Sequence, residues 1–531
     1  MALFSLTWSR SESGFEGLFM TPFTRREVLK VLPAAGAATL GVTASAVGAG
    51  FEQRAMRAFP QPEVRRPRPG SGRLQTRLAV RLTDQVVPGL GSVRTRTYEG
   101  SIPGPTLRVR AGDRIDIMHV NALPPNPSHR HADVNVPHDF NTFNLHTHGM
   151  HVAPTGIADN IFRTFDPAPR AGDAPRVYHS SIAVPASHPA GTFWYHPHHH
   201  GSTTTQLLNG MAGVLIVEGD IDQVPEIAAA KDVVVCITEM KLHGGRIPDL
   251  TSETTYSDIT STFLVNGARN PTLTLAPGEV QRWRLVNAAA LTSLPLSLSG
   301  HSLHTIARDG ITFLKPAAAP TVPLPMGGRA DVLVRGGKPG TYHLTATGLL
   351  QPLITVVVTG TPRPTPMPLP TELPGRPTRL PAPVGTRELI FRSYDGVFSG
   401  AFPNAYRILG TGVTPHADRA AGVKDRRWGR FAPDFVNHRL RLGAVEEWTV
   451  RNESATHSNH PFHLHTNHFL VTSVGSTPLS TPVWHDTISI PQDSHIVFRV
   501  RFEDFTGRTV LHCHQLQHED EGMMQIVEYT T

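Results

Sequence analysis

The segment Leu511-His512-Cys513-His514-Gln515-Leu516-Gln517-His518, which leads on to Met523, concentrates soft metal ligands near the end of the sequence. A thiolate combined with imidazoles and a weak thioether is typical of a blue-copper electron-transfer site. A small zinc site or a surface histidine cluster is the alternative, although structural zinc sites usually contain more than one cysteine. If the segment is a strand, its side chains alternate between two faces, so Cys513 points away from His512 and His514. One strand can therefore supply ligands to two different metal sites.

Three further histidine motifs extend this pattern: His146-Thr147-His148, His196-Pro197-His198 and His460-Pro461-Phe462-His463-Leu464-His465. On a strand, the two imidazoles of a His-x-His pair lie on one face, whereas His460, three residues before His463, lies on the other. One predicted group therefore contains His460, Cys513, His518 and Met523. The second contains eight imidazoles, which are too many for one metal ion and match three: His146, His148, His196, His198, His463, His465, His512 and His514. The remaining histidines are interpreted as surface groups or neighbours of ligands, among them His129, His131, His151, His199, His200, His457 and His468.

The composition favours many short strands. Only 17% of the residues are charged, and the sequence contains 46 glycines and 47 prolines, which is typical of a turn-rich β protein. Residues 1–75 hold ten Lys/Arg against five Asp/Glu, so most of the net charge of +6 lies there and the rest of the chain has no nucleic-acid footprint. If Cys513 binds metal, the second cysteine, Cys236, has no disulfide partner within the chain. Because Cys236 stands in an apolar run, we expect a buried strand residue there.

A repeated pattern predicts three domains. An apolar residue, a glycine three positions later and an asparagine nine positions after the glycine recur about 165 residues apart. This period is far too long for a solenoid and suits β-sandwich domains. The three copies are Val109, Gly112 and Asn121, then Leu275, Gly278 and Asn287, then Leu440, Gly443 and Asn452. We predict domains over residues 76–222, 228–362 and 384–531, with a Pro-rich linker over residues 363–383.

The N-terminal region looks like an export signal. Arg25 and Arg26 precede a mildly apolar run, which resembles a twin-arginine signal over residues 1–50 with a cleavage site near Ala44-Ser45-Ala46. A membrane anchor is the alternative, but the run is too rich in Gly, Ala and Thr to span a bilayer stably. Residues 51–75 are rich in Arg and Pro and are interpreted as a tether. We therefore expect a periplasmic or secreted protein that is exported folded and has no stable membrane anchor.

Taken together, the four histidine motifs resemble those of the multicopper oxidases, the family of laccases, ascorbate oxidase, ferroxidases and bacterial cuprous oxidases. The likeness covers about residues 75–531 and looks closest to the bacterial laccase-like members, related to spore-coat laccases and cuprous oxidases. It implies an all-β fold of three cupredoxin-like Greek-key β-sandwich domains that hold four copper ions: one type 1, one type 2 and two type 3. By this resemblance, His460, Cys513 and His518 bind the type 1 copper, with Met523 as a weak axial ligand. The resemblance assigns His146 and His463 to type 2 copper, and the type 3 pair to His148, His196, His198, His465, His512 and His514.

The resemblance also implies a function. A laccase-like member couples one-electron oxidation of phenolic or aromatic-amine substrates to four-electron reduction of O₂ to water. Asp159 and Glu519 match acidic positions that family members use for proton delivery, and we expect Glu519 to face His512 and His514. The implied partners are O₂ and a small reducing substrate, with no nucleic acid, and the protein is expected to be a monomer.

Three alternatives stay open at this point. The first is a metallo-oxidase acting on Cu(I), Mn(II) or Fe(II), although Met367 stands almost alone where cuprous oxidases often carry a Met-rich insert. The second is a copper-binding protein without turnover. The third is a copper-free structural relative; such members lack the cysteine and several histidines, all of which this sequence retains.

Overall fold

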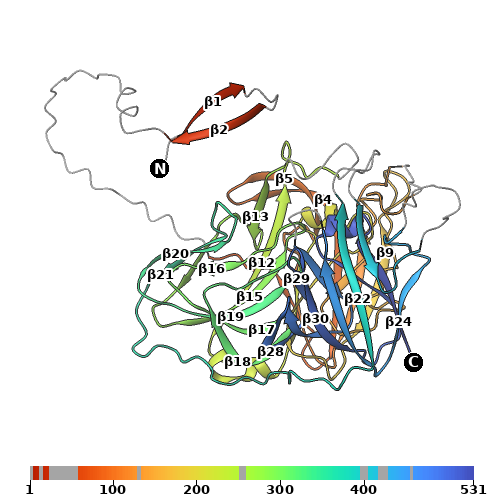
Figure 1. Cartoon of the computed structure of the whole chain (residues 1–531). Helices are drawn as coiled ribbons and strands as arrows, with labels where there is room; N and C mark the ends of the chain where they lie inside the picture. Colours follow the sequence, from red (N-terminus) through yellow and green to blue (C-terminus); the bar gives the residue numbers. More distant parts are fainter. Residues whose placement is uncertain are drawn as a thin grey trace. The chain divides into compact units, whose positions relative to one another are not determined.

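The computed structural model describes residues 4–10, 16–22, 58–127, 133–249, 259–394, 405–415, 428–454 and 459–531. Strands dominate the described chain (Figure 1), so the all-β prediction is confirmed. Residues 1–56 form one compact unit, in which β1 (Phe4–Arg10) pairs antiparallel with β2 (Glu16–Pro22). Residues 57–531 form the other unit. The predicted twin-arginine pair and cleavage site lie outside the described residues.

The first sandwich consists of two sheets, with strand orders β3-β6-β11-β10-β8 and β5-β4-β7-β9. Inward-facing apolar side chains such as Leu78, Ile117 and Phe193 form its core. Helix α1 (Thr203–Leu208) connects its last two strands. The strands are β3 (Val64–Arg65), β4 (Arg73–Val87), β5 (Gly91–Tyr98), β6 (Thr106–Arg110), β7 (Arg114–Asn121), β8 (His146–His148), β9 (Arg176–Ala183), β10 (Gly191–His196) and β11 (Gly213–Glu218).

The second sandwich follows a 3₁₀ turn, η2 (Asp220–Gln223), and the short helix α2 (Pro225–Ala228). Its sheets have the orders β13-β12-β15-β19-β17-β18 and β14-β21-β20-β16. Cys236 in β12 is fully buried, as predicted. Burial raises the pKa of its thiol to about 12, so this cysteine is unreactive. The strands are β12 (Lys231–Lys241), β13 (Ser261–Val265), β14 (Thr272–Leu275), β15 (Val280–Ala288), β16 (Leu296–Leu298), β17 (Leu303–Arg308), β18 (Ile311–Ala319), β19 (Arg329–Arg335), β20 (Gly340–Ala346) and β21 (Ile354–Val358).

The third sandwich has sheets with the orders β23-β22-β25-β30-β27-β28 and β24-β32-β31-β26-β29. The alternation expected of a strand is visible in β25, where Trp448 and Val450 enter the core. Helix α3 (Leu516–Asp520) lies between the last two strands. The strands are β22 (Gly385–Tyr394), β23 (Ala405–Gly410), β24 (Val436–Arg441), β25 (Val445–Asn452), β26 (His460–Leu464), β27 (Phe469–Val474), β28 (Thr477–His485), β29 (Thr487–Ile490), β30 (Ser494–Arg501), β31 (Gly507–Cys513) and β32 (Met524–Thr530).

The repeated residues occupy equivalent places in the three sandwiches. Each glycine has a positive φ (91°, 78° and 79°), which a turn between two strands can require and which glycine adopts without strain. Each asparagine accepts a hydrogen bond through Oδ1 from the backbone N–H two residues later. In each sandwich, the strand that carries this asparagine pairs in parallel with an earlier strand: β7 with β4, β15 with β12 and β25 with β22. The repeat therefore marks three copies of one sandwich topology.

The Pro-rich segment at residues 363–383 contains neither helix nor strand. It runs along the second sandwich, where Met367, Leu369 and Leu373 pack against buried apolar residues. The Met367 sulfur also accepts a hydrogen bond from the Val280 N–H at 3.3 Å. The domain boundaries themselves stay a prediction, because residues 57–531 form a single compact unit. None of the helices in the described residues is long and apolar enough to cross a membrane.

Candidate metal centres

The cysteine site consists of His460, Cys513 and His518. The first two lie on the neighbouring strands β26 and β31, and His518 lies on α3. The Cys513 sulfur is 3.4 Å from His460 Nδ1 and 3.7 Å from His518 Nδ1, and the two nitrogens are 3.1 Å apart. All three side chains are buried. This compact set of one sulfur and two imidazole nitrogens matches the donor chemistry of a blue-copper centre.

Of the two methionines that follow, Met523 is the one on the cysteine side. Met523 and Cys513 belong to the same apolar core, and the Cys513 N–H donates to the Met523 carbonyl at 3.0 Å. Met524 begins β32 and packs instead with Ile161 and Phe431. The structure therefore places Met523, as the sequence predicts, within the surroundings of the cysteine site.

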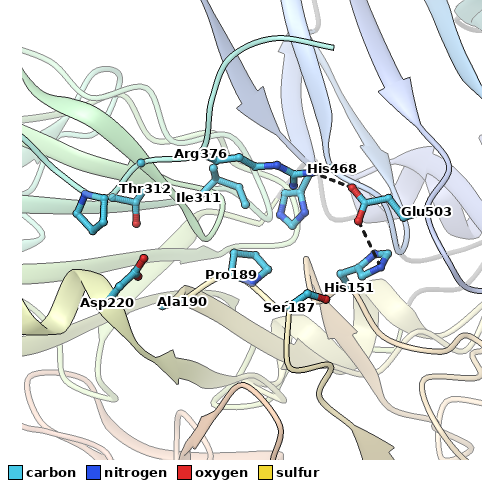
Figure 2. A pocket seen from close by; sticks show the side chains of 12 residues that line it. His151, Ser187, Pro189, Ala190, Asp220, Ile311, Thr312, Arg376, His468 and Glu503 are labelled. Carbon is cyan, nitrogen blue, oxygen red and sulfur yellow. Dashed lines mark hydrogen bonds and ion pairs between the residues drawn. The ribbon is translucent and has the colours of Figure 1, made fainter. Parts of the chain in front are cut away.

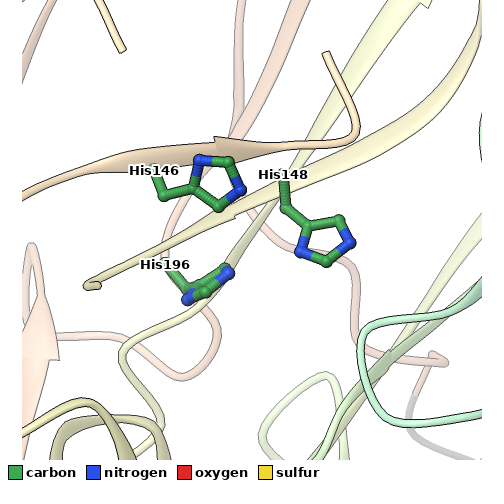
Figure 3. Close-up of side chains that lie close together, drawn as sticks. All are labelled: His146, His148 and His196. Atoms are coloured by element: carbon green, nitrogen blue, oxygen red, sulfur yellow. The ribbon is translucent and has the colours of Figure 1, made fainter. Parts of the chain in front are cut away.

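The eight predicted cluster histidines lie together at the junction of the first and third sandwiches; we refer to them as the eight-histidine site. None is more than 2% exposed. Figure 3 shows His146 and His148 on β8 facing His196 at the end of β10. Contacts between the sandwiches complete the group, since His512 Nε2 lies 3.1 Å from His198 Nε2 and 3.3 Å from His465 Nε2. His148 Nδ1 likewise lies 3.2 Å from His514 Nε2.

The state of these imidazoles fits a metal-binding role. Burial lowers the pKa of all eight below the ordinary value, so they are neutral and keep a free lone pair. Three of them donate Nδ1–H to a backbone carbonyl, which leaves Nε2 as the ligand atom: His196 to Pro197, His463 to Asp486 and His512 to Cys513. Within the described residues, His146 Nε2, His196 Nε2 and His463 Nε2 are buried without a hydrogen-bond partner. Unpaired buried nitrogens that converge in this way suit copper ions.

The structure adds a buried acid that the motif analysis missed. Asp486, between β28 and β29, lies 3.3 Å from His148 Nε2, and its backbone carbonyl accepts from His463 Nδ1 at 2.8 Å. Thr487 Oγ1 lies 3.0 Å from the same nitrogen of His148. The Arg329 guanidinium, from the second sandwich, forms a bidentate ion pair with the Asp486 carboxylate. We call Asp486 and Arg329 the latch, because this pair joins the second sandwich to histidines of the other two.

Gly149 explains how the latch comes so close to the ligand strand. Its φ is 83°, and a Cβ atom at this position would collide with both Arg329 and Asp486. The glycine of the His146-Thr147-His148-Gly149 motif therefore serves the packing of the latch against His148.

The two predicted proton-delivery acids lie beside the eight-histidine site. The Asp159 carboxylate is 3.1 Å from His146 Nδ1 and accepts a hydrogen bond from the Thr147 N–H. Glu519 Oε1 lies 3.9 Å from His198 Nδ1 and 3.5 Å from His200 Nδ1. Burial raises the pKa of Asp159 to about 6 and that of Glu519 to about 7.

The direction of Glu519 differs from the expectation that it faces His512 and His514. The carboxylate of the next residue, Asp520, accepts hydrogen bonds from the N–H groups of Gly201, Thr203 and Thr204. These bonds hold α3 against the start of α1. Glu519 is thereby directed to His198, which in turn contacts His512.

A cavity of about 320 Å³ is lined by His468, a neighbour of the latch. Figure 2 shows His151 and His468 at its wall, beside the ion pair of Arg376 with Glu503. His468 Nε2 is 3.5 Å from Asp486 Oδ2, so polar groups lead from this cavity to the latch. His468 is therefore a buried neighbour of the latch, and His151 is buried at the cavity wall, where it contacts Asp504; His129, His131 and His457 lie outside the described residues.

Comparison with known proteins agrees with this geometry. Three family models, each described as multicopper oxidase, match residues 82–221, 242–362 and 413–531. A multicopper oxidase of Staphylococcus aureus is 24% identical over 82% of this chain and 84% of the relative. A laccase of Haloferax volcanii is 26% identical over 95% and 90%. The cell division protein FtsP of Dickeya dadantii is 26% identical over 80% and 83%.

Two solved structures show the same fold. A laccase from Pediococcus acidilactici superposes with a TM-score of 0.70 at 21% identity, over 90% of this chain and 94% of that one. A multicopper oxidase from Campylobacter jejuni, described as a metallo-oxidase, gives 0.67 at 22% identity, over 89% and 96%. The predicted fold of cupredoxin-like Greek-key sandwiches is thus confirmed.

Proposed function

The chain belongs to the multicopper oxidase family, and on that premise we propose that it couples one-electron oxidation of phenols or aromatic amines to four-electron reduction of O₂ to water. The observation that carries the proposal is the position of Cys513 in the cysteine site, directly between two residues of the eight-histidine site, His512 and His514. O₂ needs four electrons, whereas a phenol gives one at a time. The backbone of residues 512–514 connects the two donor sets covalently. It therefore offers a short path along which electrons, accepted one at a time at the cysteine site, can reach the eight-histidine site.

The proposed ligand roles follow the two sites. His460, Cys513 and His518 would hold one type 1 copper ion, with Met523 as a further, weak ligand. His146 and His463 would hold the type 2 ion, and the other six histidines of the eight-histidine site the type 3 pair. Copper, when bound, supplies reversible one-electron chemistry that no amino-acid side chain here provides. The protein orients the imidazoles through hydrogen bonds and keeps both sites buried.

The reducing substrate is proposed to be organic. The Haloferax volcanii laccase matches nearly the whole chain, and Met367 is engaged in a hydrogen bond with the second sandwich. A lone, packed methionine is a poor cuprous-ion site. The similarity to FtsP raises a non-enzymatic role, but the complete set of buried donors supports turnover.

Steady-state kinetics with O₂ uptake test this function. The copper-loaded enzyme is given a phenol, ferrous ion and cuprous ion in parallel. We expect the highest kcat/KM with the phenol and one O₂ consumed per four electrons. A higher kcat/KM with either metal ion would identify a metallo-oxidase, and no O₂ uptake with any donor would leave a copper-binding protein.

Asp159 and Glu519 are proposed to deliver protons to the eight-histidine site during the reduction of O₂. Each buried carboxyl group can hold a proton near neutral pH beside a ligand histidine. We expect Glu519→Gln and Asp159→Asn to remain blue and to be reduced normally by substrate without air. Reoxidation by O₂ should be at least about tenfold slower, since a general acid typically contributes about 10²–10⁴ in rate. Stopped-flow absorbance measures this step.

Glu521 provides the matched control. It is also buried on the C-terminal side of α3, and burial raises its pKa to about 7. Its side chain accepts a hydrogen bond from Gln517 at 3.0 Å, away from the histidines. Glu521→Gln should reoxidise at the rate of the unmodified enzyme. Wild-type reoxidation in Glu519→Gln or Asp159→Asn would remove that residue from the proton path.

Export in the folded state is the proposed route to the periplasm or the medium. Arg25 and Arg26 have the spacing of a twin-arginine signal ahead of an apolar run. We expect Arg25→Lys together with Arg26→Lys to leave the precursor in the cytoplasm, as measured by fractionation and immunoblotting. Normal secretion of this double variant would argue for a general secretory signal or a cytosolic protein.

A further inference from the structure

A third group of metal-binding side chains lies outside the two centres described above. One ligand atom each from His138, Asp139 and His199 lie within 4.8 Å of one another. The two imidazole rings are 6.0 Å apart between centroids, against 5.8 Å for His146 and His463 in the eight-histidine site. All three residues are half-buried, so water can reach the remaining positions around an ion.

The hydrogen bonds of this group leave its ligand atoms free. His138 Nδ1 donates to the Val136 carbonyl at 2.6 Å, which leaves the lone pair on Nε2. His199 Nε2 is shielded from water and has no hydrogen-bond partner among the described residues. Among the described residues, no hydrogen bond or ion pair engages the Asp139 carboxylate, which lies beside both imidazoles. A ligand histidine that donates its other nitrogen to a carbonyl is the arrangement usual at metal sites.

The backbone supports the arrangement. Asp139 has a φ of 50°, and the Thr142 N–H closes a turn on its carbonyl at 2.8 Å. The His138 N–H donates to the Gly201 carbonyl, which ties this turn to the segment that carries His199. A Cβ atom on Gly201 would collide with the His138 ring, so the glycine lets the ring lie against the chain there.

We propose that His138, Asp139 and His199 form a fifth metal site, which takes a divalent first-row transition ion and is separate from the four copper positions. Two imidazoles and one carboxylate are a mixed nitrogen and oxygen set that suits Zn²⁺ and similar ions. In a tetrahedral zinc site the donor atoms lie about 3.4 Å apart, as follows from zinc–nitrogen distances of about 2.0–2.1 Å. Small side-chain rotations close the present separation.

Zinc alone is the probe for this site. The copper-loaded full-length protein is dialysed against Zn²⁺, and bound zinc and copper are counted by mass spectrometry. We expect one zinc ion per chain that His138→Ala removes and that Asp139→Asn, which tolerates the same positive φ, weakens at least about tenfold. Both variants should keep their copper content and blue colour, which shows that they fold.

His179→Ala is the matched control, because His179 is an exposed histidine of the first sandwich. It should bind zinc like the unmodified protein. Absence of zinc uptake by the copper-loaded protein, or uptake that His138→Ala and Asp139→Asn leave unchanged, would overturn the proposal.

Discussion

Cys513→Ser is expected to abolish both the blue colour and the oxidase activity, while the three copper ions proposed for the eight-histidine site stay bound. A blue copper site absorbs at about 600 nm because of charge transfer from a thiolate to copper. Serine has no thiolate, so this absorption should disappear. The eight-histidine site is built from contacts between imidazoles and does not use the Cys513 sulfur, so copper ions held there should be retained. Absorption spectroscopy, copper counting and O₂ uptake measure the three consequences.

Cys236→Ser is the control for this experiment. Cys236 is equally buried but lies in β12 of the second sandwich. A buried hydroxyl without a partner costs about 1–3 kcal/mol of stability, so the folded fraction is measured as well. The folded Cys236→Ser protein should be blue and active. A blue Cys513→Ser protein, or a colourless but folded Cys236→Ser protein, would contradict the assignment of the cysteine site.

The local sequence was sufficient to predict which donors meet. The alternation of side chains in β31 puts Cys513 with His460, whereas His512 meets His198 and His465. His146 and His148 meet for the same reason, because β8 puts both imidazoles on one face. In the other three His-x-His pairs the second histidine follows the end of its strand. The repeated glycine and asparagine predicted three similar domains for a comparable reason, since each marks a turn and a strand end.

The groups that surround the donors could not be predicted in this way. Arg329 and Asp486 are 157 residues apart, and no spacing rule connects residues on two different sandwiches. The direction of Glu519 depends on how Asp520 holds α3 against Gly201 and Thr204. Proline content predicted an irregular linker at residues 363–383, but not that its few apolar side chains pack along the second sandwich. Each of these features depends on packing between residues that are far apart in the sequence.

Replacing Asp486 of the latch is expected to lower both the stability of the protein and its copper affinity. Asp486→Ala removes the bidentate partner of Arg329, which is 1% exposed and keeps only a longer ion pair with Asp309, at 3.5 Å. Removing one partner of a buried ion pair destabilises a protein by about 3–5 kcal/mol. The variant also removes the contact of the carboxylate with His148, and groups that orient ligand histidines contribute about 10–100-fold to metal affinity. We therefore expect a lower unfolding free energy in denaturant and copper affinity weakened about 10–100-fold at the eight-histidine site.

A double variant separates these two effects. In Asp486→Leu with Arg329→Met, both partners of the ion pair become apolar, which is often neutral for stability, and buried Asp309 keeps its contact with His485 at 2.9 Å. Stability should therefore recover, whereas copper affinity should stay weak because His148 no longer has its carboxylate neighbour.

Asp331→Ala provides the contrast, because it breaks the buried ion pair of Asp331 with Arg282 in the second sandwich. Among the described residues, Asp331 makes no hydrogen bond or ion pair with the eight histidines. This variant should lose stability and keep its copper affinity. If copper affinity instead follows stability in all three variants, Asp486 serves only to hold the sandwiches together. If affinity falls only where Asp486 is replaced, whatever the stability, the carboxylate positions the histidine ligands.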